Sequence, residues 1–296
     1  VCEKEYGEPI GHNWDNGFCT NEFDHIACDA YESAVPVTAD NYAALGLSND
    51  YIGYYAITNA GNLYWFADKV DNDNANFGSA NAVLTADIKI PSKPSGTRHW
   101  NPIGSADAKY SGIFDGNGKA IGDIFAGDTT ADMVGLVAWL TEDGVVKNVT
   151  VTGVRLNGND TVGAIVAYNE GTVELCGNTA SVIGEGVRIG GIVGVNLGTV
   201  RNCWNTGRIN GKDAGGIVGD NESGAKLENC WYTGKLDGTN VGGIVANNKA
   251  GATVENCYTT RETAIATAEG TASKVETKTA DQFASGEVAY LLGDVW

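Results

Sequence analysis

The sequence predicts an all-β fold, a right-handed parallel β-helix (solenoid) with coils of about 27 residues and short capping helices at both ends. Three observations predict it. Cysteines recur every 27 residues, at Cys176, Cys203, Cys230 and Cys257. Short apolar segments that contain glycine recur at nearly the same interval, and length differences between coils are confined to turns, as a solenoid tolerates. Right-handedness is expected because parallel crossovers are nearly always right-handed.

Each predicted coil contains three strands of four or five residues, separated by Gly and Asn. Segments of this length are too short to form the pair of helices found in helical repeats. They suit a β-helix. Equivalent residues of neighbouring coils then stack about 4.8 Å apart. We therefore expect the Ile-Val pairs and the cysteines to point inward. Two columns of stacked asparagines are expected in the turns, one at Asn169, Asn196, Asn221 and Asn248 and the other at Asn148, Asn202, Asn229 and Asn256.

The chain divides into four predicted parts. Residues 1–35 form a small Cys/His-rich module, 36–56 a linker, 57–278 the solenoid (clearest over 134–260) and 279–296 a C-terminal capping helix that we expect to be truncated. An amphipathic helix over residues 59–70 is the predicted N-terminal cap, with one apolar face of Leu63, Phe66, Ala67 and Val70. Thr279 is the predicted N-cap of the last helix. Its apolar residues Phe283, Val288, Leu291 and Leu292 are expected to cover the last coil.

The repeats resemble the GLUG motif. They combine Gly-hydrophobic-hydrophobic-Gly with Asn-x-Gly-Thr-Val and Asn-Cys-aromatic, as in the stretch from Gly191 to Trp204. The segment from Trp100 to Ile121 is similar to one that often opens such arrays in gut Firmicutes. The resemblance covers about residues 57–296 and implies a bacterial cell-surface or secreted protein. GLUG repeats also occur in some IgA-specific metallopeptidases, but the motif itself has no assigned chemistry.

The N-terminal module resembles a small ribbon module of Firmicutes surface proteins, although Cys19 and Cys28 are separated by eight residues instead of two. Cys2, His12, Cys19 and Cys28 are candidate ligands of a structural Zn²⁺ ion, with His25 as a substitute. Four protein ligands would leave no open position for a water. A disulfide between two of the three cysteines, or free thiols, are the alternatives.

The cysteine column of the solenoid is expected to be reduced. Stacked cysteines lie within the Cα range of a disulfide, but in-register parallel side chains do not point at each other. A buried free Cys behaves as a small hydrophobic residue. We therefore interpret the column as structural.

Charge and hydropathy exclude several partners. The formal charge is −18, from 19 basic and 37 acidic residues, and such a chain repels phosphate backbones. We therefore expect no nucleic-acid partner. No run of 18 apolar residues is present, so no membrane insertion is expected. The chain is expected to be a monomer.

No catalytic residues are predicted. The chain has three histidines and no HExxH, so neither a His-based triad nor the metallopeptidase motif is present. Polysaccharide-degrading β-helices need clustered carboxylates, and the equivalent positions here are not acidic in register. We therefore expect a non-enzyme.

One pattern indicates binding. Trp204, Trp231 and Tyr258 each follow a cysteine, and Tyr232 is adjacent to Trp231. If the cysteines point inward, these rings form an outward stripe that could stack on a glycan or anchor a surface protein. Alternatively, the rings pack on each other or under a loop as a stabilising ladder.

The sequence thus predicts a non-catalytic extracellular solenoid segment of a bacterial surface or secreted protein, acting as an adhesion, stalk or ligand-binding module. The alternatives are an accessory binding region of a larger secreted peptidase or carbohydrate-active enzyme, and a β-helix enzyme that degrades polysaccharides.

Overall fold

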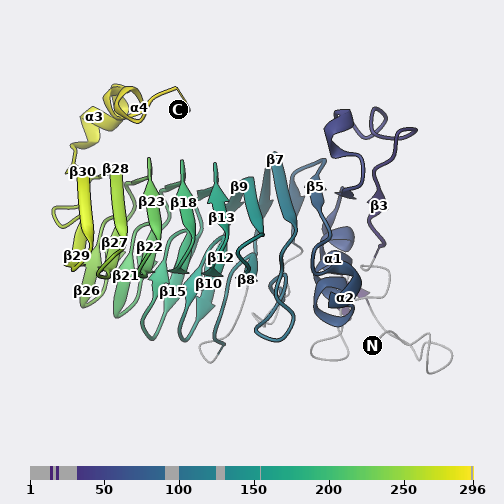
Figure 1. The fold of residues 1–296 in the computed structure, drawn as a ribbon, viewed down its shortest axis with the longest axis horizontal. Helices are drawn as coiled ribbons and strands as arrows, with labels where there is room; N and C mark the ends of the chain where they lie inside the picture. Colours follow the sequence, from purple (N-terminus) through teal and green to yellow (C-terminus); the bar gives the residue numbers. More distant parts are fainter. Residues whose placement is uncertain are drawn as a thin grey trace.

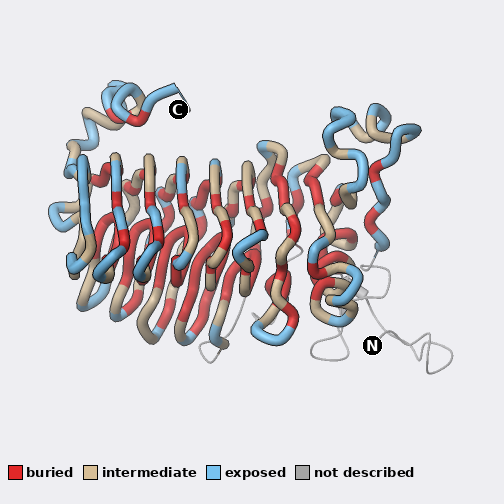
Figure 2. Tube along the Cα trace, in the orientation of Figure 1, coloured by how far each residue is buried: buried red, intermediate tan, exposed pale blue. Residues whose placement is uncertain are grey.

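A computed structural model describes residues 14–15, 18–19, 32–90, 100–124, 131–153, 155–294 and 296. The described chain forms a parallel β-solenoid with short helices near both ends (Figure 1). Its strands stack coil upon coil along one axis, and the buried residues run through the interior of the stack (Figure 2). The predicted fold class is confirmed.

Of the predicted zinc ligands, Cys2, His12 and Cys28 lie outside the described residues, and only the backbone of Cys19 is described. Of residues 1–31, the structure describes only the backbone of two short strands, β1 (Trp14–Asp15) and β2 (Phe18–Cys19). These two strands pair antiparallel. The zinc site, the disulfide and the free thiols therefore all remain open predictions for this module.

The predicted linker over residues 36–56 is folded. β3 (Val35–Pro36) pairs antiparallel with β4 (Tyr55–Ile57), and the 3-10 helix η3 (Asn49–Tyr51) lies between them. Val37, Leu47 and Ala56 are buried together with Val83 in a small apolar cluster. The prediction of a linker is wrong because three buried apolar residues of this segment pack against Val83 of the next strand.

The N-terminal cap is formed by α1 (Ala60–Asn72), which is followed by α2 (Asn74–Phe77). Asn59 is the N-cap residue of α1, and its side chain accepts a hydrogen bond from the backbone N–H of Asn62. The predicted apolar face is buried in the main core, and the Phe66 ring packs edge-on against Tyr110. This helix thus closes one end of the core, as predicted.

Parallel ladders build the body of the molecule (Figure 1). The longest sheet contains β5 (Ala82–Leu84), β6 (Ile88–Lys89), β7 (Ile113–Gly122), β9 (Val145–Thr152), β13 (Thr172–Glu174), β18 (Thr199–Arg201), β23 (Lys226–Glu228), β28 (Thr253–Thr259) and β30 (Thr271–Thr277). The same sheet includes β14 (Gly177–Asn178), β19 (Trp204–Asn205) and β24 (Trp231–Tyr232).

Three further sheets complete the coils. One contains β8 (Val137–Leu140), β12 (Val166–Asn169), β17 (Val193–Asn196), β22 (Val218–Asn221), β27 (Val245–Asn248) and β29 (Ile265–Ala268). The second contains β10 (Arg155–Gly158), β15 (Ser181–Gly184), β20 (Ile209–Asn210) and β25 (Leu236–Asp237). The third contains β11 (Val162–Gly163), β16 (Ile189–Gly190), β21 (Asp213–Gly215) and β26 (Asn240–Gly242).

The residue before each inward cysteine makes a sharp bend. Asn202, Asn229 and Asn256 adopt left-handed φ values of 55°, 54° and 52°. Asparagine tolerates this conformation better than most residues, which accounts for the recurring Asn-Cys pair. Their side chains form the predicted column, since the Nδ2 atoms of Asn229 and Asn256 donate to the preceding Asn at 3.2 and 2.8 Å.

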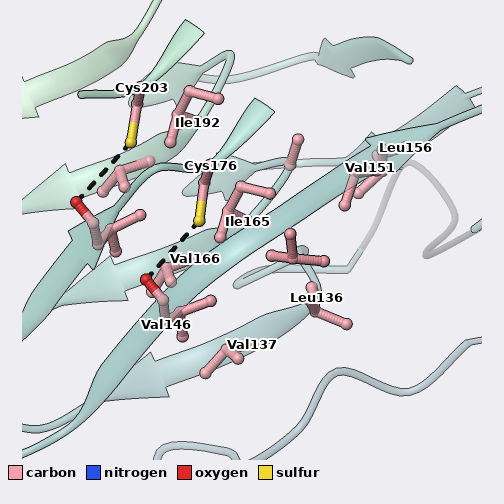
Figure 3. Packing of buried hydrophobic residues seen from close by; sticks show 14 of the residues in the cluster. Leu136, Val137, Val146, Val151, Leu156, Ile165, Val166, Cys176, Ile192 and Cys203 are labelled. Atoms are coloured by element: carbon pink, nitrogen blue, oxygen red, sulfur yellow. Dashed lines mark hydrogen bonds between the residues drawn. The ribbon is translucent and has the colours of Figure 1, made fainter. Parts of the chain in front are cut away.

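The cysteines form one inward column. All four are fully buried and free. The thiols of Cys176 and Cys203 donate to the carbonyl oxygens of Val146 and Val173, each at 3.7 Å, and lie among the Ile-Val pairs (Figure 3). Burial raises the pKa of the Cys176 and Cys230 thiols well above the usual value, so both stay protonated and unreactive.

A ladder of buried amides runs beside this core. The Nδ2 atoms of Asn169, Asn196 and Asn221 each donate to the Oδ1 of the next asparagine, at 2.7, 2.9 and 2.9 Å. A further rung joins Asn178 to Asn205 at 3.0 Å and was not predicted. A Cβ atom on Gly191 would lie 1.9 Å from Asn205 Nδ2, so the second glycine of the Gly-Gly pair makes room for this side chain.

The C-terminal cap differs from the prediction. Thr279 is the N-cap, and it makes a capping box with Gln282. However, the helix breaks into α3 (Ala280–Ala284) and α4 (Glu287–Leu292), because Gly286 adopts a φ of 82° between them. Both helices lie over the side of the coils rather than across their end (Figure 1), and their apolar residues pack on Trp231 and Tyr258.

Candidate functional site

Three of the predicted stripe residues form an outward ladder. Trp204, Trp231 and Tyr258, here called the aromatic ladder, are register partners on adjacent strands. The rings of Trp204 and Trp231 are stacked, with centroids 5.7 Å apart and an angle of 15° between their planes. Each ring follows an inward cysteine, and adjacent residues of an extended chain point to opposite faces. The rings therefore point outward, as the sequence predicted.

The C-terminal helices cover most of this ladder. Trp231 contacts the rings of Phe283 and Trp296, with centroids 5.7 and 5.9 Å apart. Tyr258 is only 2% exposed, beneath Val288 and Leu292. Trp231 and Tyr258 are therefore packing residues that stabilise the protein, which was the alternative interpretation of the stripe. Trp204 is the half-buried end of the ladder.

Ion pairs hold the connection between the last strand and these helices. The Lys278 ammonium lies 3.0 Å from a Glu276 carboxylate oxygen and 3.5 Å from one of Glu287. It also lies 5.9 Å from the ring centroid of Tyr258. The same lysine therefore joins β30, α4 and the ladder.

Tyr232 does not belong to the outward stripe. It is fully buried, and its register partner one coil earlier is the inward Asn205. A Cβ atom on Gly216 would lie 2.4 Å from its ring, so a glycine again makes the space. The prediction for Tyr232 is wrong because adjacent residues of a strand point to opposite faces.

A second outward column was missed by sequence reasoning. Trp139 of β8 and Tyr168 of β12 are register partners, with ring centroids 4.1 Å apart. The Lys109 ammonium lies 3.9 Å from the Trp139 centroid, which is cation–π geometry. Burial, followed by the charge of Glu170, raises the pKa of Tyr168. The signal was present in the sequence, because both rings follow the glycine-containing strand of their coil.

A pocket of about 430 Å³ lies beside this second column. It is lined by Asn74, Gly78, Ser79, Ala106, Asp107, Lys109, Ser111 and Thr141. These residues come from the end of α2, from the irregular segment 105–111 and from the turn after β8. Sequence reasoning could not assemble this pocket because none of these segments belongs to the repeat.

The most connected buried charge is Asp115 in β7. Its carboxylate accepts hydrogen bonds from Tyr51 Oη at 3.0 Å and from the Asn117 backbone N–H at 2.7 Å. The Lys147 ammonium lies 3.4 Å away. Tyr51 belongs to η3, so this cluster ties the N-terminal segment to the solenoid, and its groups are satisfied within the protein.

The described residues contain neither a metal-binding cluster nor a membrane-spanning helix. Across the described ranges, no group of three or more His, Cys, Asp or Glu side chains is arranged to hold a metal ion. None of the helices within those ranges is both long enough and apolar enough to cross a membrane.

Known proteins resemble parts of this chain. No family model matches it. Halomucin from Haloquadratum walsbyi is 30% identical over 121 residues, which are 40% of this chain and 1% of that protein. A protein of Evansella cellulosilytica named "Putative Gly-rich membrane protein" is 32% identical over 78 residues, which are 25% of this chain and 9% of that protein. The chain thus spans a small fraction of either relative.

A solved structure shares the fold. The crystal structure of a "putative immunoglobulin A1 protease" from Bacteroides ovatus superposes with a TM-score of 0.52 and covers 82% of this chain and 88% of that one. The sequence identity is 21%. At this identity the similarity supports the solenoid architecture alone.

Proposed function

We propose that this chain is a non-catalytic, extracellular β-solenoid segment of a bacterial surface or secreted protein that acts as a stalk or adhesion module. One observation carries the proposal: the side chains that recur from coil to coil pack within the protein and join neighbouring coils. The cysteines and the amide ladder lie inside, and Trp231 and Tyr258 lie beneath the C-terminal helices. A repeat array whose recurring residues join neighbouring coils is built as an extended scaffold.

Three further features support a scaffold of this kind. The repeats resemble the GLUG motif, which implies a surface or secreted protein. The net charge of −18 favours solubility and disfavours polyanionic partners. The matched stretches are small parts of much longer proteins, which also fits a module within a large chain.

Surface location can be tested with the natural host. An antibody against this segment should label intact cells or the culture medium, while a cytoplasmic marker is labelled only after lysis. Labelling of this segment only after lysis would contradict the proposal.

An accessory region of a larger secreted enzyme is the second candidate, because the solved structural neighbour is named a putative IgA1 protease. The isolated chain, incubated with human IgA1, should leave the immunoglobulin intact on a denaturing gel. Cleavage that persists in the purified chain would establish an enzyme instead.

The N-terminal module has its own proposal, a structural zinc ion held by Cys2, His12, Cys19 and Cys28. Metal analysis of the purified chain checks it, with one zinc per chain as the expected result. A Cys2→Ser and Cys28→Ser double variant should lose the metal.

A further inference from the structure

The pocket beside Lys109 lies where the N-terminal cap meets the first coils. It is an open, shallow pocket whose volume of about 430 Å³ falls within the range of about 300–1,000 Å³ of small-molecule sites. Sites of this kind often form between structural units. Here α2 contributes one wall, and segment 105–111 with Thr141 contributes the others.

Hydrogen bonds fix the walls in place. The Asn74 Nδ2 atom donates to the carbonyl oxygens of Val70 at 2.9 Å and Lys109 at 3.1 Å, so it joins the helices to the segment opposite. The backbone N–H of Ser111 donates to the Gly78 carbonyl oxygen at 2.7 Å. A ligand would therefore meet a preformed shape and would not have to order a loop.

The lining selects the class of ligand. It contains no large aliphatic or aromatic side chain, so an apolar molecule would gain little from entering. Asp107 and Lys109 contribute one charge of each sign, which favours neither an anion nor a cation. The remaining polar side chains are an amide and three hydroxyls. Such a surface matches a neutral molecule that carries many hydroxyl groups.

Two observations concern groups without partners. Thr141 Oγ1 and Trp139 Nε1 are buried and make no hydrogen bond within the described part of the chain. Unsatisfied buried polar atoms are uncommon, and each one destabilises the fold. Thr141 lines the pocket, and Trp139 is joined to it through Lys109. Rotation of the half-buried Thr141 side chain would turn its hydroxyl toward the pocket, where a hydroxylated ligand would supply the missing partner.

We propose that this pocket binds a neutral sugar residue, with Thr141, Ser79 and Asp107 as hydrogen-bonding groups and the Lys109–Trp139 pair at its edge. The inference deepens the proposed adhesion function by naming its ligand class. It moves the binding site from the aromatic ladder, which the C-terminal helices cover, to the opposite half of the array. It does not depend on where the protein is located, so surface labelling and sugar binding can fail separately.

The test is an array of neutral, uronic-acid-containing, sialylated and amino-sugar oligosaccharides, followed by calorimetric titration of the best neutral ligand. Binding should weaken at least tenfold in Ser79→Trp, which fills the pocket, and in Thr141→Val, which removes one hydroxyl at constant shape. Trp204→Ala is the matched control on the aromatic ladder and should bind normally. Melting temperatures of all variants establish that each one folds.

Three outcomes would overturn the proposal. The first is no binding to any neutral glycan. The second is binding only to acidic or amino sugars. The third is neutral-glycan binding that persists in folded Ser79→Trp and is lost in Trp204→Ala, which would return the site to the aromatic ladder.

Discussion

Leu175 occupies the left-handed bend that asparagine occupies in neighbouring coils, with a φ of 56°. A branched apolar residue in this conformation costs about 1–2 kcal/mol, whereas asparagine visits it readily. Leu175 also interrupts the column between Asn148 and Asn202, and it is 39% exposed, so its own burial contributes little.

Leu175→Asn is therefore expected to stabilise the protein by about 1 kcal/mol, measured by urea unfolding. Leu197→Asn is the matched control, because Leu197 is similarly exposed at 36% and has no left-handed φ. That variant should show no gain. Equal effects of the two changes would contradict the role assigned to the bend.

The contact between Tyr51 and Asp115, which joins the N-terminal segment to the solenoid, makes stability depend on pH. Burial and the neighbouring Asp115 raise its pKa from 10.0 to about 12. The folded state thus favours the neutral phenol. This stabilisation is fully present below pH 10 and is lost as the pH rises towards 12.

Asp115→Asn should therefore lower the Tyr51 pKa towards 10, read as the phenolate absorbance that Tyr51→Phe removes. The Tyr51→Phe variant should also show a flatter stability profile across this alkaline range. An unchanged Tyr51 pKa in Asp115→Asn would mean that the carboxylate does not hold the phenol.

Among the elements, the C-terminal helices depend on Trp231. Its ring touches both Phe283 and Trp296, and aromatic pairs contribute about 0.5–1.5 kcal/mol each beyond burial. Trp231→Ala should release α3 and α4, seen as faster hydrogen exchange over residues 280–292. The solenoid strands should keep their protection.

Trp204→Ala is the control for this experiment, since Trp204 stacks on Trp231 at the end of the ladder away from Tyr258. It should leave exchange in α3 and α4 nearly unchanged. Helices that stay protected in Trp231→Ala would show that the ladder is not their anchor.

Most features that the sequence predicted correctly belong to residues that recur from coil to coil. The cysteine column, the asparagine ladders and the apolar face of α1 each follow from spacing and strand or helix periodicity. The inward position of Tyr232 also follows from strand alternation beside an outward Trp231, although it was not predicted. The break at Gly286 and the fold-back of α3 and α4 depend on tertiary contacts that no local pattern records.

The pocket beside Lys109 could not be predicted from the sequence. Asn74, Lys109 and Thr141 lie in three segments that share no repeat, and only the closure of the first coils by α1 and α2 brings them together. The acidic composition gave no indication of a neutral, hydroxyl-lined site. The regularity that makes the coils predictable therefore ends where this candidate ligand site begins.

At the scale of the whole molecule, we expect the central coils to be interchangeable structural units. Cys203 and Cys230 are 27 residues apart, and each thiol donates to the carbonyl oxygen two residues earlier, at 3.2 and 3.1 Å. Deletion of residues 204–230 would therefore join Cys203 to Trp231 and keep every ladder in register. Deletion of residues 204–216 removes about half a coil and is the matched control, because it would place inward residues on the outer face.

The most direct measurement is urea unfolding of these two deletion variants, combined with their lengths from small-angle scattering. We expect the full-coil deletion to unfold cooperatively and to be shorter by about one strand spacing, 4.8 Å. The half-coil deletion should be unfolded or aggregated. Loss of cooperative folding in the full-coil deletion, or normal folding of both, would contradict the claim that each coil is one repeating structural unit.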